Sequence, residues 1–204
     1  MDFPKYCGDI HPDEWINDLT TKLEYKGIDN FDFIKALVDT TVINISDEIY
    51  PDFEELRKAL KEDVSFTVFK NTNKRMLQVL KYVPERKGGK TSEFISKFRK
   101  LCYNAEINDV EEQKKYLFKS ISDDHYIYFL TEFNKKMKNV NSMNKLIETF
   151  EEIIMDESNL INNESIVTLK HVATGKYLSS IENLCYATGS KGQLVCFMFF
   201  FILK

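Results

Sequence analysis

The sequence contains three histidines, and histidine is the side chain most often used as a metal ligand or as an acid–base catalyst near neutral pH. His11 precedes an expected helix, His125 follows Asp123 and Asp124 at the start of another, and His171 falls in an expected strand. Metal and catalytic sites use residues at recognisable spacings, and these histidines occupy three separate elements. The aspartate pair is better explained as helix-capping side chains than as a general acid and base. The sequence therefore predicts no metal ion, no cofactor and no catalytic residue.

Residues 88–91 read Gly-Gly-Lys-Thr, like the last part of a phosphate-binding loop, since glycine amides in front of a helix attract anions. A complete loop needs a further glycine five residues upstream, where Val83 and Pro84 stand. The Gly-x-Ser-x-Gly motif of a nucleophilic serine is also absent from the sequence. We therefore expect no nucleotide site and interpret the chain as a non-enzyme.

The net charge of −4 conceals an uneven distribution. Residues 1–56 hold 4 Lys and Arg against 14 Asp and Glu (−10), residues 57–100 hold 13 against 4 (+9), and residues 101–204 hold 11 against 14 (−3). The acidic block could attract the basic segment of another copy, or the basic segment could bind a polyanion such as RNA weakly through phosphate contacts. Alternatively, the charges cancel within one folded domain. The candidate polyanion-binding residues are Lys70, Lys74, Arg75, Lys81, Arg86, Lys87 and Lys90.

The composition predicts a folded, mostly helical chain. Of 204 residues, 43% are hydrophobic, and only 7 Gly and 4 Pro interrupt the chain, which favours long helices over a loop-rich fold. The four scattered cysteines lack metal-ligand spacing, so we interpret them as reduced thiols of an intracellular, cytoplasmic protein. We also expect no signal peptide and no membrane span.

Apolar residues recur at helical spacing as far as about residue 157, and eight helices are expected. Their expected starts are Pro12, Asp29 or Asn30, Pro51, Thr67, Thr91, Asp109, Ser122 and Ser142. Thr91 and Ser92 are expected to cap the fifth helix, and Asp109 the sixth. Pro84 and the glycine pair after it divide the helices into two groups.

The hairpin at 88–117 carries a family resemblance. Residues 93–101 read Glu-Phe-x3-Phe-Arg-x-Leu, with Ala105 following, and resemble the core of the Gag capsid domain of long-terminal-repeat retrotransposons. Residues 11–15, His-Pro-x2-Trp, resemble the opening of that family's amino-terminal lobe. The resemblance covers about residues 11–157 and implies a bilobed helical unit that self-assembles, with lobes at 11–86 and 87–157. The Cys-x2-Cys-x4-His-x4-Cys knuckle that packages RNA in many Gag proteins is missing from the sequence.

From residue 164 the apolar residues alternate as in a strand, followed by a turn and a return strand. This segment resembles one repeat of the MIR domain, the β-trefoil module of protein O-mannosyltransferases and of inositol trisphosphate and ryanodine receptors. A trefoil needs three repeats, so residues 164–204 offer one incomplete leaf and an apolar tail. The resemblance implies that the matching residues build the hairpin, and that glycan binding requires the missing repeats. The matching residues are Val167, Leu169, His171, Thr174, Gly175, Tyr177 and Leu178.

The sequence thus predicts a mainly α protein with a short carboxy-terminal β segment. We interpret it as a non-enzymatic protein-interaction or assembly module, derived from a retroelement Gag and fused to a truncated MIR domain, whose partner is itself or another protein. Two alternatives stay open: a ligand- or glycan-binding adaptor of the MIR type, and a decayed or truncated gene product without activity. The apolar run at 197–203 supports the latter and is expected either to pack on the helical unit or to lower solubility.

Overall fold

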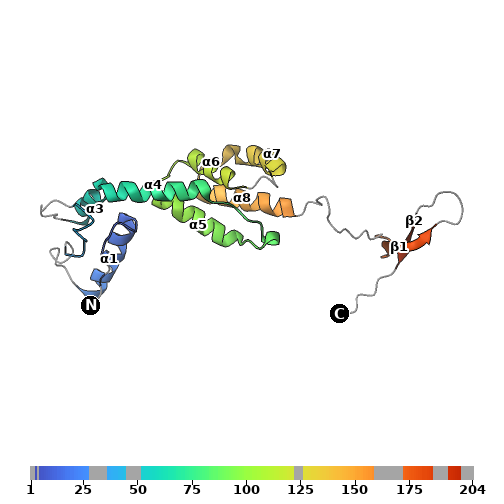
Figure 1. Ribbon diagram of the computed structural model, residues 1–204, viewed down its shortest axis with the longest axis horizontal. Helices are drawn as coiled ribbons and strands as arrows, with labels where there is room; N and C mark the ends of the chain where they lie inside the picture. Colours follow the sequence, from blue (N-terminus) through green and yellow to red (C-terminus); the bar gives the residue numbers. More distant parts are fainter. Residues whose placement is uncertain are drawn as a thin grey trace. The chain divides into compact units, whose positions relative to one another are not determined.

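The computed structural model describes residue 3 and residues 5–27, 36–44, 52–121, 126–158, 172–185 and 193–198. The chain divides into two compact units, Met1–Glu157 and Ser158–Lys204. The protein is mainly helical, as the sequence predicts (Figure 1). The helices described in the first unit are α1 (Pro12–Lys26), α3 (Phe53–Glu62), α4 (Val64–Val79), α5 (Thr91–Asn104), α6 (Val110–Ser120), α7 (Tyr126–Lys136) and α8 (Met143–Ser158), with the short 3-10 helices η1 (Glu85–Lys87) and η3 (Met137–Asn139).

Polar side chains start several of these helices by accepting hydrogen bonds from first-turn amides. The carboxylate of Asp52 accepts the amide of the third residue of α3 at 2.9 Å, and the carboxylate of Asp109 accepts two amides of α6. The hydroxyl of Ser142 accepts an amide of α8 at 3.2 Å. The capping predicted for Asp109 is confirmed, and α3 and α8 also begin next to their predicted starts.

Two predicted helix starts need correction. Helix α4 begins at Val64 rather than Thr67, because Asp63 ends α3 and accepts the amide of Ser65 at 2.7 Å. Helix α5 follows Lys90 without a side-chain cap among the described residues. The hydroxyl of Thr91 lies instead 3.3 Å from the hydroxyl of Tyr82, so it joins the helix to the preceding segment.

The helix predicted to begin near Asp29 lies partly outside the described residues, but its end can be checked. Val38, predicted on its buried side, forms a parallel bridge with Tyr6. The amide of Tyr6 donates to the carbonyl of Leu37 at 2.8 Å, and the amide of Asp39 donates to the carbonyl of Tyr6 at 3.0 Å. The helix prediction is wrong at Val38, since pairing with a distant residue leaves no mark on local apolar spacing.

Two clusters of buried apolar side chains form the interior of the helical unit. The first joins the start of the chain, α1, residues 36–44 and α3, and is made of Phe3, Tyr6, Trp15, Ile16, Leu19, Leu23, Leu37, Val38, Ile43, Leu56 and Leu60. The second joins the end of α4 to α5, α6, α7 and α8, and includes Leu77, Tyr82, Phe94, Phe98, Leu101, Leu117, Phe129, Leu146, Phe150 and Ile153. Helix α4 contacts α3, α5 and α6, and in Figure 1 it runs from α3 along α5. This helix therefore spans the distance between the two clusters.

In the second unit, the backbone of β1 (Tyr177–Cys185) pairs antiparallel with that of β2 (Gln193–Met198). Tyr177 lies opposite Met198, and the register becomes irregular between Ser180 and Cys185. Two paired strands do not distinguish a trefoil leaf from any other hairpin. The identification as part of a trefoil therefore stays a prediction, and residues 164–171 and 199–204 lie outside the described part.

Candidate interaction surfaces

A cluster of charged side chains surrounds the buried residue His11, the N-cap of α1. Its Nδ1 atom accepts the amide of Asp13 at 3.2 Å, and its Nε2 atom lies 3.7 Å from Oε1 of Glu106. The ring packs edge-on against Phe66 of α4 and lies 4.6 Å, centroid to centroid, from the ring of Tyr103 of α5. His11 is 2% exposed, so it fastens the start of α1 against α4 and α5.

Lysines from α3 and α4 complete this cluster. The ammonium of Lys61 lies 2.8 Å from Asp13 and 3.1 Å from Glu106, and the ammonium of Lys70 lies 3.1 Å from the other oxygen of Glu106. Burial opposes the charge of Glu106, but hydrogen bonds from both lysines outweigh it and lower its pKa. Burial likewise opposes the charge of Lys61, and its two carboxylate partners raise its pKa. Both groups are therefore charged at neutral pH.

The histidine of this cluster is held neutral. Desolvation by burial lowers the pKa of His11 and outweighs the opposing influence of Asp13 and Glu106. A general base needs a reacting group within hydrogen-bond reach, and His11 is instead enclosed by its protein neighbours. The cluster therefore has a structural role, and His11 lies directly before the first helix, as the sequence predicts.

The residues predicted to bind a polyanion mostly have protein partners. Lys74 pairs with Glu112 at 3.1 Å, and Arg86 pairs with Glu157 at 2.8 Å. Lys90 pairs with Glu93, and Lys81 donates to the carbonyl of residue 119 at 2.9 Å. Arg75 lies exposed on α4 and Lys87 in η1, while Lys70 belongs to the His11 cluster. These residues do not form one basic face reserved for a ligand, because carboxylates of the same unit neutralise several of them.

The residues of the predicted MIR motif are described only in part. Thr174 lies in a turn and Gly175 has a φ of +69°, a left-handed conformation that suits glycine. Tyr177 and Leu178 open β1. Val167, Leu169 and His171 lie outside the described residues.

Helix α4 carries exposed apolar side chains opposite its buried face. Val64, Val68 and Val79 are 71%, 59% and 75% exposed, and Met76 is 44% exposed. Together with Thr72 they fall on one side of the helix at spacings of three and four residues, and we call this set the α4 stripe. Phe66 and Leu77 point the other way, into the interior. Helix α4 therefore carries apolar side chains on two opposite faces, and the exposed Arg75 shares the outer face with the α4 stripe.

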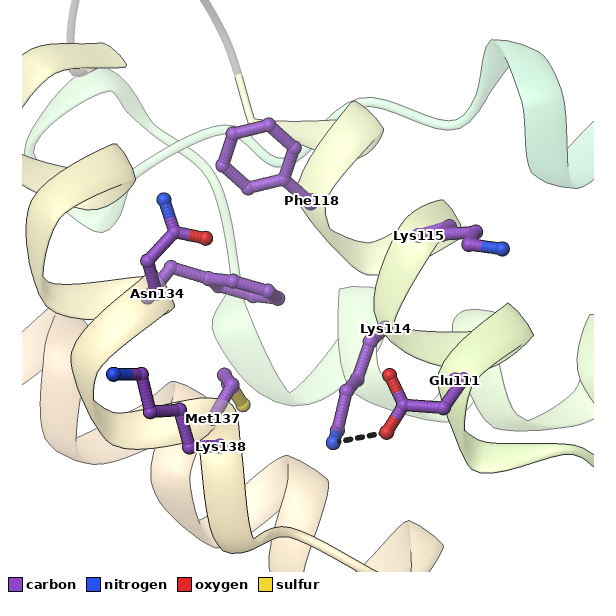
Figure 2. A pocket seen from close by; sticks show the side chains of 8 residues that line it. Glu111, Lys114, Lys115, Phe118, Asn134, Met137 and Lys138 are labelled. Carbon is purple, nitrogen blue, oxygen red and sulfur yellow. Dashed lines mark hydrogen bonds and ion pairs between the residues drawn. The ribbon is translucent and has the colours of Figure 1, made fainter.

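A second surface feature is a groove of about 310 Å³ between α6 and the segment formed by α7 and η3. Phe133 and Met137 are buried beneath it, and the ring of Phe118 lies 5.2 Å, centroid to centroid, from that of Phe133. Figure 2 shows Lys114 extending from α6 toward Met137, with its ammonium bonded to Glu111 at 2.6 Å. The groove thus combines an apolar base with a basic side chain.

No family model matches this chain, and neither the curated proteins nor the solved structures contain a match to it. Among the described residues no group of three or more His, Cys, Asp or Glu side chains could hold a metal ion. In that same part of the chain, no helix has the length and apolar character required to cross a bilayer.

Sequence reasoning missed the His11 cluster, the α4 stripe and the groove. A signal for the groove was present, because Lys114 falls between Val110 and Leu117 on the apolar side of its helix. The cluster left no comparable signal, since Lys61 and Glu106 lie far apart in the sequence.

Proposed function

We propose that the helical unit is a non-enzymatic protein-interaction module that associates with a second copy of itself through the α4 stripe. The exposure of Val64, Val68 and Val79 on one helix face carries this proposal. Valine is a poorer helix former than alanine or lysine, so three valines on the solvent side of one helix do not serve helix stability. Contiguous exposed apolar residues on a folded domain mark interaction sites more often than single ones do.

A second copy fits the stripe because its pattern is nearly symmetric. Val68 and Met76 lie four residues on either side of Thr72, and Val64 and Val79 lie eight and seven residues from it. Two α4 helices crossing antiparallel at Thr72 would place Val68 of one copy against Met76 of the other, and Val64 against Val79. A two-fold dimer requires such self-complementarity, since the same patch serves both partners. With a rise of about 1.5 Å per residue, the stripe extends over roughly 22 Å.

The pairing of charges within one copy favours the stripe over head-to-tail attraction between charged blocks. Asp13 of the acidic block already contacts Arg57 at 3.2 Å and Lys61 at 2.8 Å in the same chain. Glu14 of that block pairs with Lys100. These intramolecular pairs reduce the charge available to attract another copy.

Self-association is also what a capsid-like origin of residues 11–157 implies, because the Gag capsid family that the central hairpin resembles is one of self-assembling helical units. We retain that origin, the lobes at 11–86 and 87–157, and the truncated MIR domain at 164–204 as parts of the proposal.

Weak RNA binding is the less favoured function, since Lys70, Lys74 and Arg86 face carboxylates of the same unit.

Sedimentation velocity over a concentration series tests the proposal with the full chain. The wild type should associate as concentration rises, and Val68→Glu should remain monomeric because a charge would be buried in the contact. Val42→Glu is the matched control: Val42 is 53% exposed but lies outside the stripe, so this variant should associate like the wild type. A wild type that stays monomeric at every concentration would refute self-association.

The salt dependence of association separates the two modes of assembly. An apolar contact should persist at high ionic strength, whereas attraction between exposed charges is screened. The α4 stripe would be refuted as the contact if association disappeared at high salt. It would also be refuted if the Val68→Glu and Val42→Glu variants associated equally well.

A further inference from the structure

The groove between α6 and α7 contains a lysine, Lys114, whose side chain is largely buried and whose ammonium has unused hydrogen-bonding capacity. The side chain of Lys114 is 9% exposed, and Glu111 is its hydrogen-bond partner among the described residues. An ammonium ion carries three donors, and burying a charge is costly unless it is well paired. The side chain of Glu111 is 68% exposed, and its carboxylate accepts only one of the three hydrogen bonds that the Lys114 ammonium can donate. A ligand carboxylate could accept a second hydrogen bond from this ammonium.

The base of the groove favours an apolar group next to that carboxylate. Phe133 and Met137 are 6% and 3% exposed, and Phe118 packs beside Phe133 at the upper end of the groove in Figure 2. Aromatic rings and the methionine thioether make favourable contacts with an inserted aromatic side chain. The volume of about 310 Å³ is close to the lower end of ligand sites, about 300 Å³, and suits one such side chain with its flanking backbone.

The charges around the groove favour an acidic partner. Its lining includes three lysines, Lys114, Lys115 and Lys138, and one glutamate, which gives a net charge of +2. Lys115 and Lys138 are exposed, and in Figure 2 they lie on α6 and η3, on opposite sides of the groove. Basic residues at the rim of an apolar groove attract carboxylates and increase the rate of encounter.

We propose that this groove binds an acidic peptide segment of a partner protein, with an aromatic side chain over Phe133 and Met137 and a neighbouring carboxylate bonded to Lys114. An extended segment fits because Lys115 and Lys138 flank the groove on opposite sides and, although their side chains extend outward in Figure 2, their charges attract acidic residues before and after the aromatic one. The site uses no residue of the α4 stripe, so it stands independently of the proposed self-association.

Fluorescence anisotropy can measure the Kd of this groove for an acidic peptide. The probe is a labelled peptide in which one phenylalanine is flanked by glutamates, and it is titrated with the full-length chain. The variant Lys114→Met should raise the Kd by about tenfold, as expected for a lost charge-assisted hydrogen bond. Methionine preserves the length of the buried side chain, so the thermal unfolding midpoint should not fall. The control Lys97→Met removes an exposed lysine of α5 outside the groove and should leave the Kd unchanged.

A second variant blocks the groove without touching the interior. Asn134 is exposed on the groove wall, and Asn134→Trp should fill the space and weaken peptide binding while leaving folding intact. The Val68→Glu variant should bind the peptide as the wild type does, so that loss of self-association and loss of peptide binding can be told apart.

Three results would overturn the proposal. Equal affinity of Lys114→Met and Lys97→Met for the peptide would show that the Lys114 ammonium takes no part in binding. Equal affinity for a peptide with alanine in place of phenylalanine would show attraction by charge alone. Tighter binding of octanoate than of the peptide would assign the groove to small apolar acids.

Discussion

The ammonium of Lys61 lies 3.1 Å from Oε1 of Glu106 and joins α3 to the turn that follows α5. Glu106 holds this position with a φ of +52°, in the left-handed region that costs a residue with a side chain roughly 1–2 kcal/mol. Glycine would adopt the turn without that cost. The interactions of the Glu106 carboxylate with Lys61 and Lys70 offset the strain.

Substitutions at Glu106 should separate the backbone cost from the contribution of the ion pairs. Glu106→Gln keeps the strained backbone and removes the charge, and should lower the free energy of unfolding by about 1–2 kcal/mol, since the partly exposed pairs are screened by solvent. Glu106→Gly loses the same pairs but relieves the backbone, so it should be the more stable of the two variants. Urea denaturation measures both values.

A double-mutant cycle supplies the control for this assignment. In the Lys61→Met background, Glu106→Gln should cost less than in the wild type, by about 0.5–1 kcal/mol, because one partner of the pair is already gone. Additive effects of Lys61→Met and Glu106→Gln would show that the 3.1 Å contact contributes nothing to stability.

His11 should make the stability of the helical unit depend on pH. Its folded-state pKa is lowered from the unfolded value of about 6.5, so between these values the unfolded chain binds more protons than the folded one. Stability should therefore fall as pH decreases through about 6.5, before the carboxylates titrate near pH 4. The groups facing His11 are Asp13, Glu14, Glu106 and Lys61.

The variant His11→Asn tests this dependence, because asparagine can still cap α1 but does not titrate. The difference in unfolding free energy between wild type and variant should shrink as pH is lowered from about 7 to about 5. Other histidines contribute equally to both proteins and cancel in the difference. A difference that stays constant over this range would contradict the lowered pKa of His11.

The features of this fold that the sequence predicts are those set by residues close together in the chain, such as helix caps and apolar spacing. Asp109 followed by apolar residues at helical spacing predicts α6 with its cap, and the structure confirms it. Asp63 was missed as the cap of α4 because the preceding helix ends at the same residue. The bridge between Tyr6 and Val38 depends on a contact across some thirty residues, and local spacing cannot reveal it.

The candidate sites were less predictable than the helices. A lysine in the apolar register, such as Lys114, signals a special environment only once the neighbouring helix is placed beside it. The basic residues 57–100 suggested a polyanion site because a sequence shows charge without showing pairing. In the structure, Lys70 and Lys74 face Glu106 and Glu112, which come from a later segment of the chain.

Cys7 and Cys102 should differ sharply in reactivity. Burial raises the pKa of Cys102 to about 12, so almost no thiolate is present near neutral pH. Cys7 is exposed. Brief treatment of the native protein with iodoacetamide, followed by peptide mass mapping, should modify Cys7 and spare Cys102. Equal modification after full denaturation is the control. Cys102 belongs to the second apolar cluster, so rapid labelling of Cys102 in the native protein would mean that this cluster opens readily.

Gly88 and Gly89 should respond very differently to alanine, although they are neighbours in the turn before α5. Gly88 has a φ of +84° and open space around its Cα, so Gly88→Ala should cost only the left-handed backbone penalty, about 1–2 kcal/mol.

A Cβ at Gly89 would lie 1.8 Å from the carbonyl oxygen of Val83, a backbone atom that cannot move aside alone. The amide of Gly89 also donates to the carbonyl of Pro84 at 3.1 Å, so relief of the clash would break the turn. Gly89→Ala should therefore lower the free energy of unfolding by about 3 kcal/mol or more, beyond the usual range for overpacking, because backbone must shift. Thermal and urea denaturation of both variants measure the difference. Gly27→Ala is a further control, since Gly27 is left-handed with no atom within 4 Å, and it should resemble Gly88→Ala. If Gly89→Ala proves no more damaging than these two, the close approach of residues 83 and 89 does not hold the turn in solution.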